Sequence, residues 1–287
     1  MAIDLFSIGR FTVHGYGLMI GLGFAAAVFM GCYLARKVGL SENDFTNIAI
    51  WVLVIGFMGG KLLYIIVEFK SFLTDPMRVL SSEGFVVYGG IITGVLSIIV
   101  YCRIKKQKSL QYLDLLGAVV PLNQSLGRIG CFLAGCCYGR RTDSWLGVEF
   151  PEGCIAPAHV KLLPTQLFMA AGDFVIFIVL VMYFLKVYKK GVQQVSANVK
   201  AQDVSPDLNG AHDFKKEPDK PEGSVAALYL VLYSIGRFII EFFRNDVRGN
   251  VGALSTSQFI AIFTFLGGAA LYIMLMKKVQ TACKDRA

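Results

Sequence analysis

Hydrophobic residues in this chain gather into seven long blocks that are separated by polar segments. The blocks cover residues 16–35, 47–67, 85–101, 113–133, 167–185, 225–243 and 259–276. A helix needs roughly 20 apolar residues to cross the hydrocarbon core of a bilayer, and most of the blocks reach that length. The pattern predicts an all-α integral membrane protein with about seven transmembrane helices. Six is the alternative count, because the third block is short and the fourth runs into a stretch rich in Gly and Cys.

The composition excludes a soluble globular domain. The 287 residues are 55% hydrophobic and 17% charged, whereas about 25% of the residues in a soluble domain are charged. The first block is too long for a signal peptide and lacks a basic leader and a cleavage site, so we expect it to remain. We expect residues 1–287 to form a single polytopic membrane domain, in which the polar segment 187–223 is a disordered cytoplasmic loop.

The distribution of basic residues predicts how the chain is oriented in the membrane. Lys and Arg are more frequent after the first, third, fifth and seventh blocks than in the other segments between blocks. Cytoplasmic loops of membrane proteins carry such an excess. The predicted topology is therefore N-out and C-in, which requires an odd number of spans. The formal net charge of +8 follows largely from this bias and gives no reason to expect nucleic acid as a partner.

Three basic residues lie inside the predicted spans. In the N-out topology, Lys61, Arg128 and Arg237 each lie roughly 8–9 Å below the outer end of their helix, at 1.5 Å per residue. A charge inside a span costs about 2.5–3.5 kcal/mol and calls for a partner or a function. Three cations at one depth predict an anion site, and lipid phosphate is the anion found near that level. For Lys61 the alternative is a side chain that reaches up to the interface.

The sixth block carries a stripe of ionisable and aromatic residues. Tyr233, Arg237, Glu241 and Arg244 follow one another at spacings of four, four and three residues, which places them on one face of a helix. We expect this face to point into the helix bundle or into a hydrated cavity. The alternative is a structural role, in which Glu241 neutralises Arg237 and Arg244.

Glycines flank one of the buried cations. In Gly127-Arg128-Ile129-Gly130, the two glycines are expected to let another backbone approach closely and to leave the guanidinium unshielded. The motifs Gly56-x-x-x-Gly60 and Gly90-x-x-x-Gly94 are more typical of helix–helix contacts.

Cysteines cluster directly after Arg128. Cys131, Cys136 and Cys137 follow it, and Cys154 lies in the next outer segment. The spacing lacks the C-x2-C pair that is typical of zinc sites. Exposure on the outer face would permit a disulfide, and small packing residues beside a tight turn are the third interpretation.

In these motifs the chain resembles the bacterial prolipoprotein diacylglyceryl transferases. The matching segments run in order along nearly the whole chain: His14-Gly15-Tyr16-Gly17-Leu18-Met19, Gly59-Gly60-Lys61, Gly89-Gly90, Asp114, Gly127-Arg128-Ile129-Gly130-Cys131-Phe132 through Gly139-Arg140, Pro164-Thr165-Gln166-Leu167, and Tyr233 to Arg244. Three positions depart from the family pattern. Tyr88 stands where a His often precedes Gly-Gly, Cys131 replaces a usual Asn, and Phe168-Met169 replaces Tyr-Glu.

The resemblance implies a transferase of the bacterial plasma (inner) membrane with its site toward the outer leaflet. Such enzymes move diacylglyceryl from phosphatidylglycerol to the thiol of the lipobox cysteine in a prolipoprotein signal peptide. They form a thioether and release glycerol phosphate. The resemblance implies that Arg128 holds the lipid head group and Arg237 the phosphate, while Tyr16, His14 and Tyr88 line the outer mouth. His14 is the candidate acceptor of the thiol proton.

The expected site therefore has a catalytic set and a binding set, with no cofactor or metal. The catalytic set is Arg128, Arg237, Tyr88 and His14. The binding set is Arg128, Tyr16, Lys61, Gly89, Gly90, Gly127, Arg140, Tyr233, Glu241 and Arg244. The expected partners are phosphatidylglycerol, signal peptides with a lipobox cysteine, and membrane lipid.

Two other functions stay open at this point. Tyr88 and Met169 motivate a non-catalytic paralogue that binds lipid or signal peptides. A small-solute or anion transporter would have broken helices near the midplane and an inverted repeat. The ionisable residues here gather near one face of the membrane instead, which disfavours a transporter.

Overall fold

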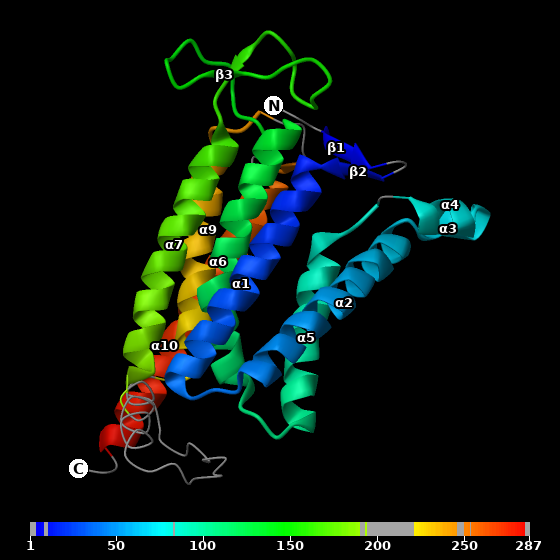
Figure 1. The fold of residues 1–287 in the computed structure, drawn as a ribbon. Helices are drawn as coiled ribbons and strands as arrows, with labels where there is room; N and C mark the ends of the chain where they lie inside the picture. The colour runs from blue at the N-terminus through cyan, green and yellow to red at the C-terminus, as the bar shows by residue number, and fades with distance from the viewer. Residues whose placement is uncertain are drawn as a thin grey trace. The chain divides into compact units, whose positions relative to one another are not determined.

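The computed structural model describes residues 4–8, 11–82, 84–189, 193, 221–245, 250–252 and 254–284 (Figure 1). Within these ranges the protein is mostly helical, with three small two-stranded sheets. The chain divides into two compact units, one of Met1–Gly39 with Asp114–Ala287 and one of Leu40–Leu113. Each unit is considered by itself. The predicted cytoplasmic loop 187–223 lies mostly outside the described residues.

Seven helices of the described chain have 18 residues or more. They are α1 (Gly15–Val38), α2 (Glu42–Val67), α5 (Val87–Ile104), α6 (Ser109–Ala134), α7 (Thr165–Val187), α9 (Ser224–Glu241) and α10 (Thr256–Lys284). Each coincides with one predicted block, and the all-α membrane fold is confirmed. Six of the described helices, all of these except α6, are long and apolar enough to cross a membrane. α6 instead carries several polar residues, which a membrane protein tolerates where neighbouring helices cover them.

In the larger unit, α6 lies among α1, α7 and α9 (Figure 1). A Cβ added at Gly130 would lie 3.2 Å from the backbone oxygen of Tyr16 in α1. Ser125 Oγ donates a hydrogen bond to a backbone carbonyl of α7 at 2.8 Å. The Tyr229 hydroxyl of α9 donates to Gln124 Oε1 at 3.1 Å. The helix that carries Arg128 is therefore in contact with three others.

Short antiparallel pairings organise the loops of the larger unit. β1 (Asp4–Ile8) pairs with β2 (Phe11–His14), β3 (Val148–Glu149) with β4 (Lys161–Leu162), and β5 (Asn250–Val251) with β6 (Leu254–Ser255). An isolated antiparallel bridge joins Gly139 to Arg244. This bridge ties the segment after α6 to the segment after α9, close to the ends of the two helices that carry the predicted arginines.

One buried carboxylate fixes the start of α9. Asp114 of α6 is fully buried and accepts hydrogen bonds from the amides of Gly223 (2.7 Å), Val225 (2.9 Å) and Ala226 (2.9 Å). The Tyr188 hydroxyl, directly after α7, donates to the same carboxylate at 3.0 Å. The first amides of a helix lack partners within the helix and attract negative charge. Asp114 therefore caps α9 from another helix and links the end of α7 to the start of α9.

We expect Asp114→Ala to lower the thermal stability of the purified protein strongly. Each buried amide left without an acceptor costs about 1–3 kcal/mol. Asp114→Asn keeps one acceptor oxygen and the side-chain shape but loses the charge, so its loss should be smaller. Unfolding midpoints measured in one detergent would rank the two variants, and an unchanged midpoint for Asp114→Ala would contradict the capping role.

The smaller unit is built on a close pair of helices, α2 and α5 (Figure 1). A Cβ added at Gly56 would lie 3.3 Å from the carbonyl oxygen of Gly90, and one added at Gly90 would lie 2.9 Å from that of Gly56. Thr93 Oγ1 donates a hydrogen bond across the pair to the Ile55 carbonyl at 3.1 Å. The predicted helix–helix role of these glycine motifs is confirmed. Two short helices, α3 (Phe69–Thr74) and α4 (Pro76–Ser81), connect α2 to α5.

Candidate active site

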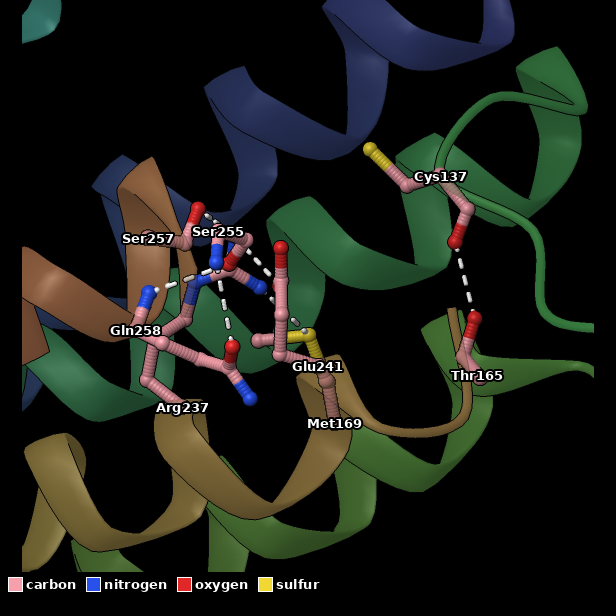
Figure 2. Close-up of polar contacts among 8 residues, drawn as sticks. All are labelled: Cys137, Thr165, Met169, Arg237, Glu241, Ser255, Ser257 and Gln258. Atoms are coloured by element: carbon pink, nitrogen blue, oxygen red, sulfur yellow. Dashed lines mark hydrogen bonds and ion pairs between the residues drawn. The ribbon is translucent and has the colours of Figure 1, made fainter. Parts of the chain in front are cut away.

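Arg237 is held in the interior of the larger unit by residues of three helices (Figure 2). Its Nη2 forms an ion pair with Glu241 Oε2 at 3.2 Å, one turn along α9, and donates a hydrogen bond to Ser257 Oγ of α10 at 2.8 Å. Its Nη1 lies 4.0 Å from Met169 Sδ of α7. The side chains of Arg237 and Glu241 are only 12% and 6% exposed. The guanidinium is thus fixed where α7, α9 and α10 meet.

Arg128 lies on α6 and is partly buried. Tyr233 and Asp173 are close enough to interact with it electrostatically, as are the two cysteines Cys131 and Cys137. Within the described part of this unit, no residue forms a hydrogen bond or an ion pair with it. A guanidinium has five N–H donors in a planar fork that fits phosphate. The donors of Arg128 are therefore available to an anion.

The structure reveals a buried carboxylate that the sequence analysis missed. Asp173 of α7 is 5% exposed and interacts electrostatically with both Arg128 and Arg237. Its Oδ2 has no hydrogen-bond partner among the described residues. Asp173 lies inside the predicted block 167–185, so the cost of burying a charge could have identified it.

We expect Asp173→Asn to slow catalysis by about tenfold with little change in lipid affinity. The carboxylate attracts both guanidinium groups, and a misplacement of 1 Å at a catalytic site costs up to about 10²-fold in rate. Steady-state kinetics would separate the two effects as a fall in kcat at nearly constant KM. If the carboxylate instead only repels the lipid phosphate, the variant would bind lipid more tightly at an unchanged kcat, and the positioning role would be wrong.

The sequence predicts Arg244 on one helical face with Tyr233, Arg237 and Glu241, but the structure places it beyond the end of α9. α9 ends at Glu241, because the residues after it pair with the segment that follows α6, as the bridge between Arg244 and Gly139 shows. The prediction of one continuous helical stripe was therefore wrong for Arg244. Its side chain is nevertheless buried. The pKa of the Cys137 thiol is lowered, mainly by hydrogen bonds with the Cys131 and Cys136 thiols and to a smaller extent by the positive charge of Arg244.

The two glycines beside Arg128 differ in their surroundings. A Cβ added at Gly130 would press on Met19 Cβ (3.0 Å) and on the Tyr16 ring (3.3 Å), so this glycine permits the close contact with α1. Nothing in the described structure lies within 4 Å of a Cβ added at Gly127. The expected close backbone approach therefore holds for Gly130 and not for Gly127, which faces open space in the described structure.

Three further predicted residues of this unit lie at helix ends or in loops. Tyr16, in the first turn of α1, has an exposed side chain, and the exposed His14 immediately precedes α1. Arg140 has an exposed side chain, but its amide donates to the Phe243 carbonyl and its carbonyl accepts from the Leu163 amide, each at 2.9 Å. The backbone of Arg140 therefore joins the segments that follow α6 and α9 to the segment before α7.

The turn after α6 brings three cysteines together. The sulfur atoms of Cys131, Cys136 and Cys137 all lie within 4.8 Å of one another. Thr165 Oγ1 donates to the Cys137 carbonyl at 2.8 Å, as Figure 2 shows, and Gln166 Nε2 donates to the Cys136 carbonyl at 2.7 Å. The first residues of α7 thus hold the backbone of this turn, which gives the Pro-Thr-Gln-Leu motif a structural role.

The remaining predicted residues belong to the smaller unit. Lys61 Nζ donates hydrogen bonds to the carbonyl and hydroxyl oxygens of Ser82 at 2.6 and 3.5 Å, so it holds the segment between α4 and α5. Tyr88, at the start of α5, has an exposed side chain. Gly89 and Gly90 contact the backbone of α2. The contribution of these four residues to substrate binding stays a prediction.

Comparison with known proteins identifies the family. A family model described as prolipoprotein diacylglyceryl transferase matches residues 4–199 and 211–274. The chain belongs to the prolipoprotein diacylglyceryl transferase family. The resemblance expected from the sequence motifs and the expectation of a transferase enzyme are both confirmed.

Relatives in the diacylglyceryl transferase family match over nearly their whole length. The chain is 39% identical to phosphatidylglycerol–prolipoprotein diacylglyceryl transferase 2 of Clostridium perfringens. The alignment spans 274 residues and covers 95% of this chain and 94% of the relative. A phosphatidylglycerol–prolipoprotein diacylglyceryl transferase of Clostridium tetani is also 39% identical, over 270 residues, with 93% and 95% covered. One of Finegoldia magna is 29% identical over 277 residues, with 96% of each chain covered.

Proposed function

We propose that this chain transfers the diacylglyceryl group of phosphatidylglycerol to the lipobox cysteine thiol of prolipoproteins. The product is a thioether, and glycerol phosphate is released. The observation that carries the proposal is the pair of partly buried arginines, Arg128 and Arg237, within helices of a membrane protein of this family. One guanidinium is fixed by protein contacts, and the other has donors that no described residue of its unit uses.

The chemistry of the transfer explains why two arginines are needed. The thiol sulfur attacks the glyceryl carbon that carries the phosphate, a C–S bond forms, and the C–O bond breaks. Its electron pair leaves with the oxygen, so the phosphate changes from a monoanion to a dianion. Preorganised cations stabilise this added charge more than they stabilise the bound lipid, which lowers the barrier.

The two arginines have different supports and therefore different proposed roles. Glu241 and Ser257 orient Arg237 before the lipid arrives, and this guanidinium faces the phosphate as its charge increases. Arg128, with open space beside Gly127, binds the head group at its phosphate through its planar fork. Met169, where the family usually has Glu, contacts Arg237, and Asp173 supplies a carboxylate one helical turn further along α7.

The remaining predicted residues have supporting roles in this proposal. Four residues of the larger unit contribute to lipid binding: Tyr16, Arg140, Tyr233 and Arg244. His14 accepts the thiol proton of the signal peptide. Tyr88, in the smaller unit, contributes a hydroxyl group to the substrate or to the leaving group.

A transfer assay with the purified full-length chain tests the function. The chain would be mixed with labelled phosphatidylglycerol and a peptide that carries a lipobox cysteine. We expect label in a thioether on the peptide and one glycerol phosphate per modified peptide, with no transfer to the matched peptide that has Ser in place of Cys. Binding of lipid and peptide without transfer would support the non-catalytic paralogue instead.

The orientation of the site in the membrane is a separate prediction. With the N-out topology, a single cysteine introduced at Ser144 should be labelled from outside intact cells, and one at Ser205 only after the membrane is opened. The background would have all seven native cysteines replaced by serine. Labelling of both positions from the same side would contradict the predicted topology.

A further inference from the structure

The three clustered cysteines have a geometry that packing alone does not require. Their sulfur atoms lie within 4.8 Å of one another, although the residues come from two different local structures. Cys131 belongs to the last turn of α6, whereas Cys136 and Cys137 follow the helix. Among the described cysteines no disulfide is formed. The C-x4-C-C spacing argued against a metal site in the sequence, but the turn after α6 brings the three sulfurs together.

Two residues of the turn have positive φ angles, and the turn in this conformation holds the three thiols close together. Cys137 has φ of 62° and Gly135 has φ of 68°, both in the left-handed region. Residues with a side chain seldom adopt this conformation, and it concentrates at functional and ligand-binding sites. In Figure 2 the Cys137 sulfur points away from Thr165, on the other side of the residue from the carbonyl that Thr165 holds. The hydrogen bonds from Thr165 and Gln166 keep the turn in this conformation.

The spacing of the sulfur atoms fits a thiolate-bound metal ion. In a tetrahedral site with Zn–S bonds of about 2.3 Å, neighbouring sulfur atoms are about 3.8 Å apart. Sulfurs that already lie within 4.8 Å reach that separation by small side-chain rotations. Three thiolates and one divalent ion leave a net charge of −1, and the guanidinium groups of Arg128 and Arg244 interact with cysteines of this cluster. The surrounding charge therefore favours the metal-bound form.

We propose that Cys131, Cys136 and Cys137 bind one thiophilic d10 metal ion, of which Zn²⁺ is the representative, through three thiolate ligands. Sulfur ligands select Zn²⁺ and Cu⁺ over the harder ions Mg²⁺ and Ca²⁺. Each thiol gives up its proton when its sulfur coordinates the ion. The ion joins the end of α6 to the turn that Thr165 and Gln166 hold. It therefore stabilises the part of the chain that lies next to Arg128.

The test measures metal on the full-length chain, purified in detergent under reducing conditions, loaded with Zn²⁺ and then desalted. We expect one Zn²⁺ per chain by elemental analysis, and near zero in Cys131→Ser, Cys136→Ser and Cys137→Ser. Cys154→Ser is the matched control, because Cys154 lies outside the trio and should retain the full metal content. A single symmetric peak on size exclusion would show that each variant is folded.

A spectroscopic measurement keeps the proposal testable even if a serine variant fails to fold. Wild-type protein loaded with Cd²⁺ should gain an ultraviolet sulfur-to-metal charge-transfer band with the intensity of three thiolates. Absence of this band, or clearly less than one metal per chain, would overturn the proposal. So would a disulfide within the trio, found by mass spectrometry of protein alkylated directly on cell lysis. Equal loss of metal in Cys154→Ser would assign a different ligand set and would also overturn it.

Discussion

Replacing Arg128 with alanine is expected to slow diacylglyceryl transfer by about 10²–10³-fold per folded molecule. Loss of one preorganised donor at a comparable electrostatic site costs about 3–4 kcal/mol. The phosphate gains its second negative charge only as the C–O bond breaks, so most of this loss should appear in the chemical step. Because no residue of its unit bonds to the guanidinium in the described structure, the accompanying loss of folding stability should be small.

Arg128→Lys separates shape from charge at the same position. A single ammonium cannot reproduce the two parallel contacts of a guanidinium with phosphate, so lysine should restore little of the rate. Arg141→Ala, which removes an exposed arginine outside the candidate site, controls for the general loss of a positive charge. Rates would be normalised to folded, membrane-inserted protein. Near-normal specific activity in both Arg128 variants would remove Arg128 from the site.

Arg237→Gln is expected to lower both the transfer rate, by about 10²-fold, and the stability of the fold. The stability should fall by about 3–5 kcal/mol, because Glu241 would become a buried carboxylate without its cation. Its side chain is 6% exposed and its ion pair with Arg237 measures 3.2 Å. The two losses have different origins, and a single substitution cannot separate them.

The double variant Arg237→Gln with Glu241→Gln separates the two roles of Arg237. Removing both charges leaves no unpaired buried ion, so the thermal midpoint should recover most of what the single variant lost. If Arg237 binds the phosphate, transfer by the double variant stays slow although the protein is stable. If Arg237 only neutralises Glu241, activity returns together with stability, and that result would remove Arg237 from the catalytic set.

The helical framework could be predicted because crossing hydrocarbon fixes both the length and the composition of a helix. Every predicted block coincides with a long helix, and the fourth, whose Gly- and Cys-rich end suggested a shorter segment, is helical through Ala134. The same physical cost made the buried charges visible in the sequence. Arg237 was found in this way, and Asp173 could have been found if acidic residues had been included.

Contacts between distant segments could not be predicted from local patterns. Asp114 caps α9 across 111 residues of sequence, and nothing in its neighbours along the chain indicates this partner. Arg244 lies beyond the end of α9 because its segment pairs with Gly139, a pairing that helical periodicity cannot show. The three cysteine sulfurs meet because Gly135 and Cys137 adopt positive φ angles. The first two features depend on the tertiary fold and the third on the backbone angles of a single turn, and spacing along the chain encodes neither.

Sulfur substitution in the lipid tests most directly whether Arg128 holds the phosphate that leaves. Phosphatidylglycerol in which sulfur replaces one non-bridging phosphate oxygen exists as two diastereomers, and sulfur is the poorer hydrogen-bond acceptor. The wild-type chain should use one diastereomer much more slowly than the other, because we expect the guanidinium fork to pair with one non-bridging oxygen and with the bridging oxygen that leaves. In Arg128→Ala that discrimination should disappear, since the contact is already lost. Equal discrimination by the wild-type chain and by Arg128→Ala would show that Arg128 does not contact the phosphate.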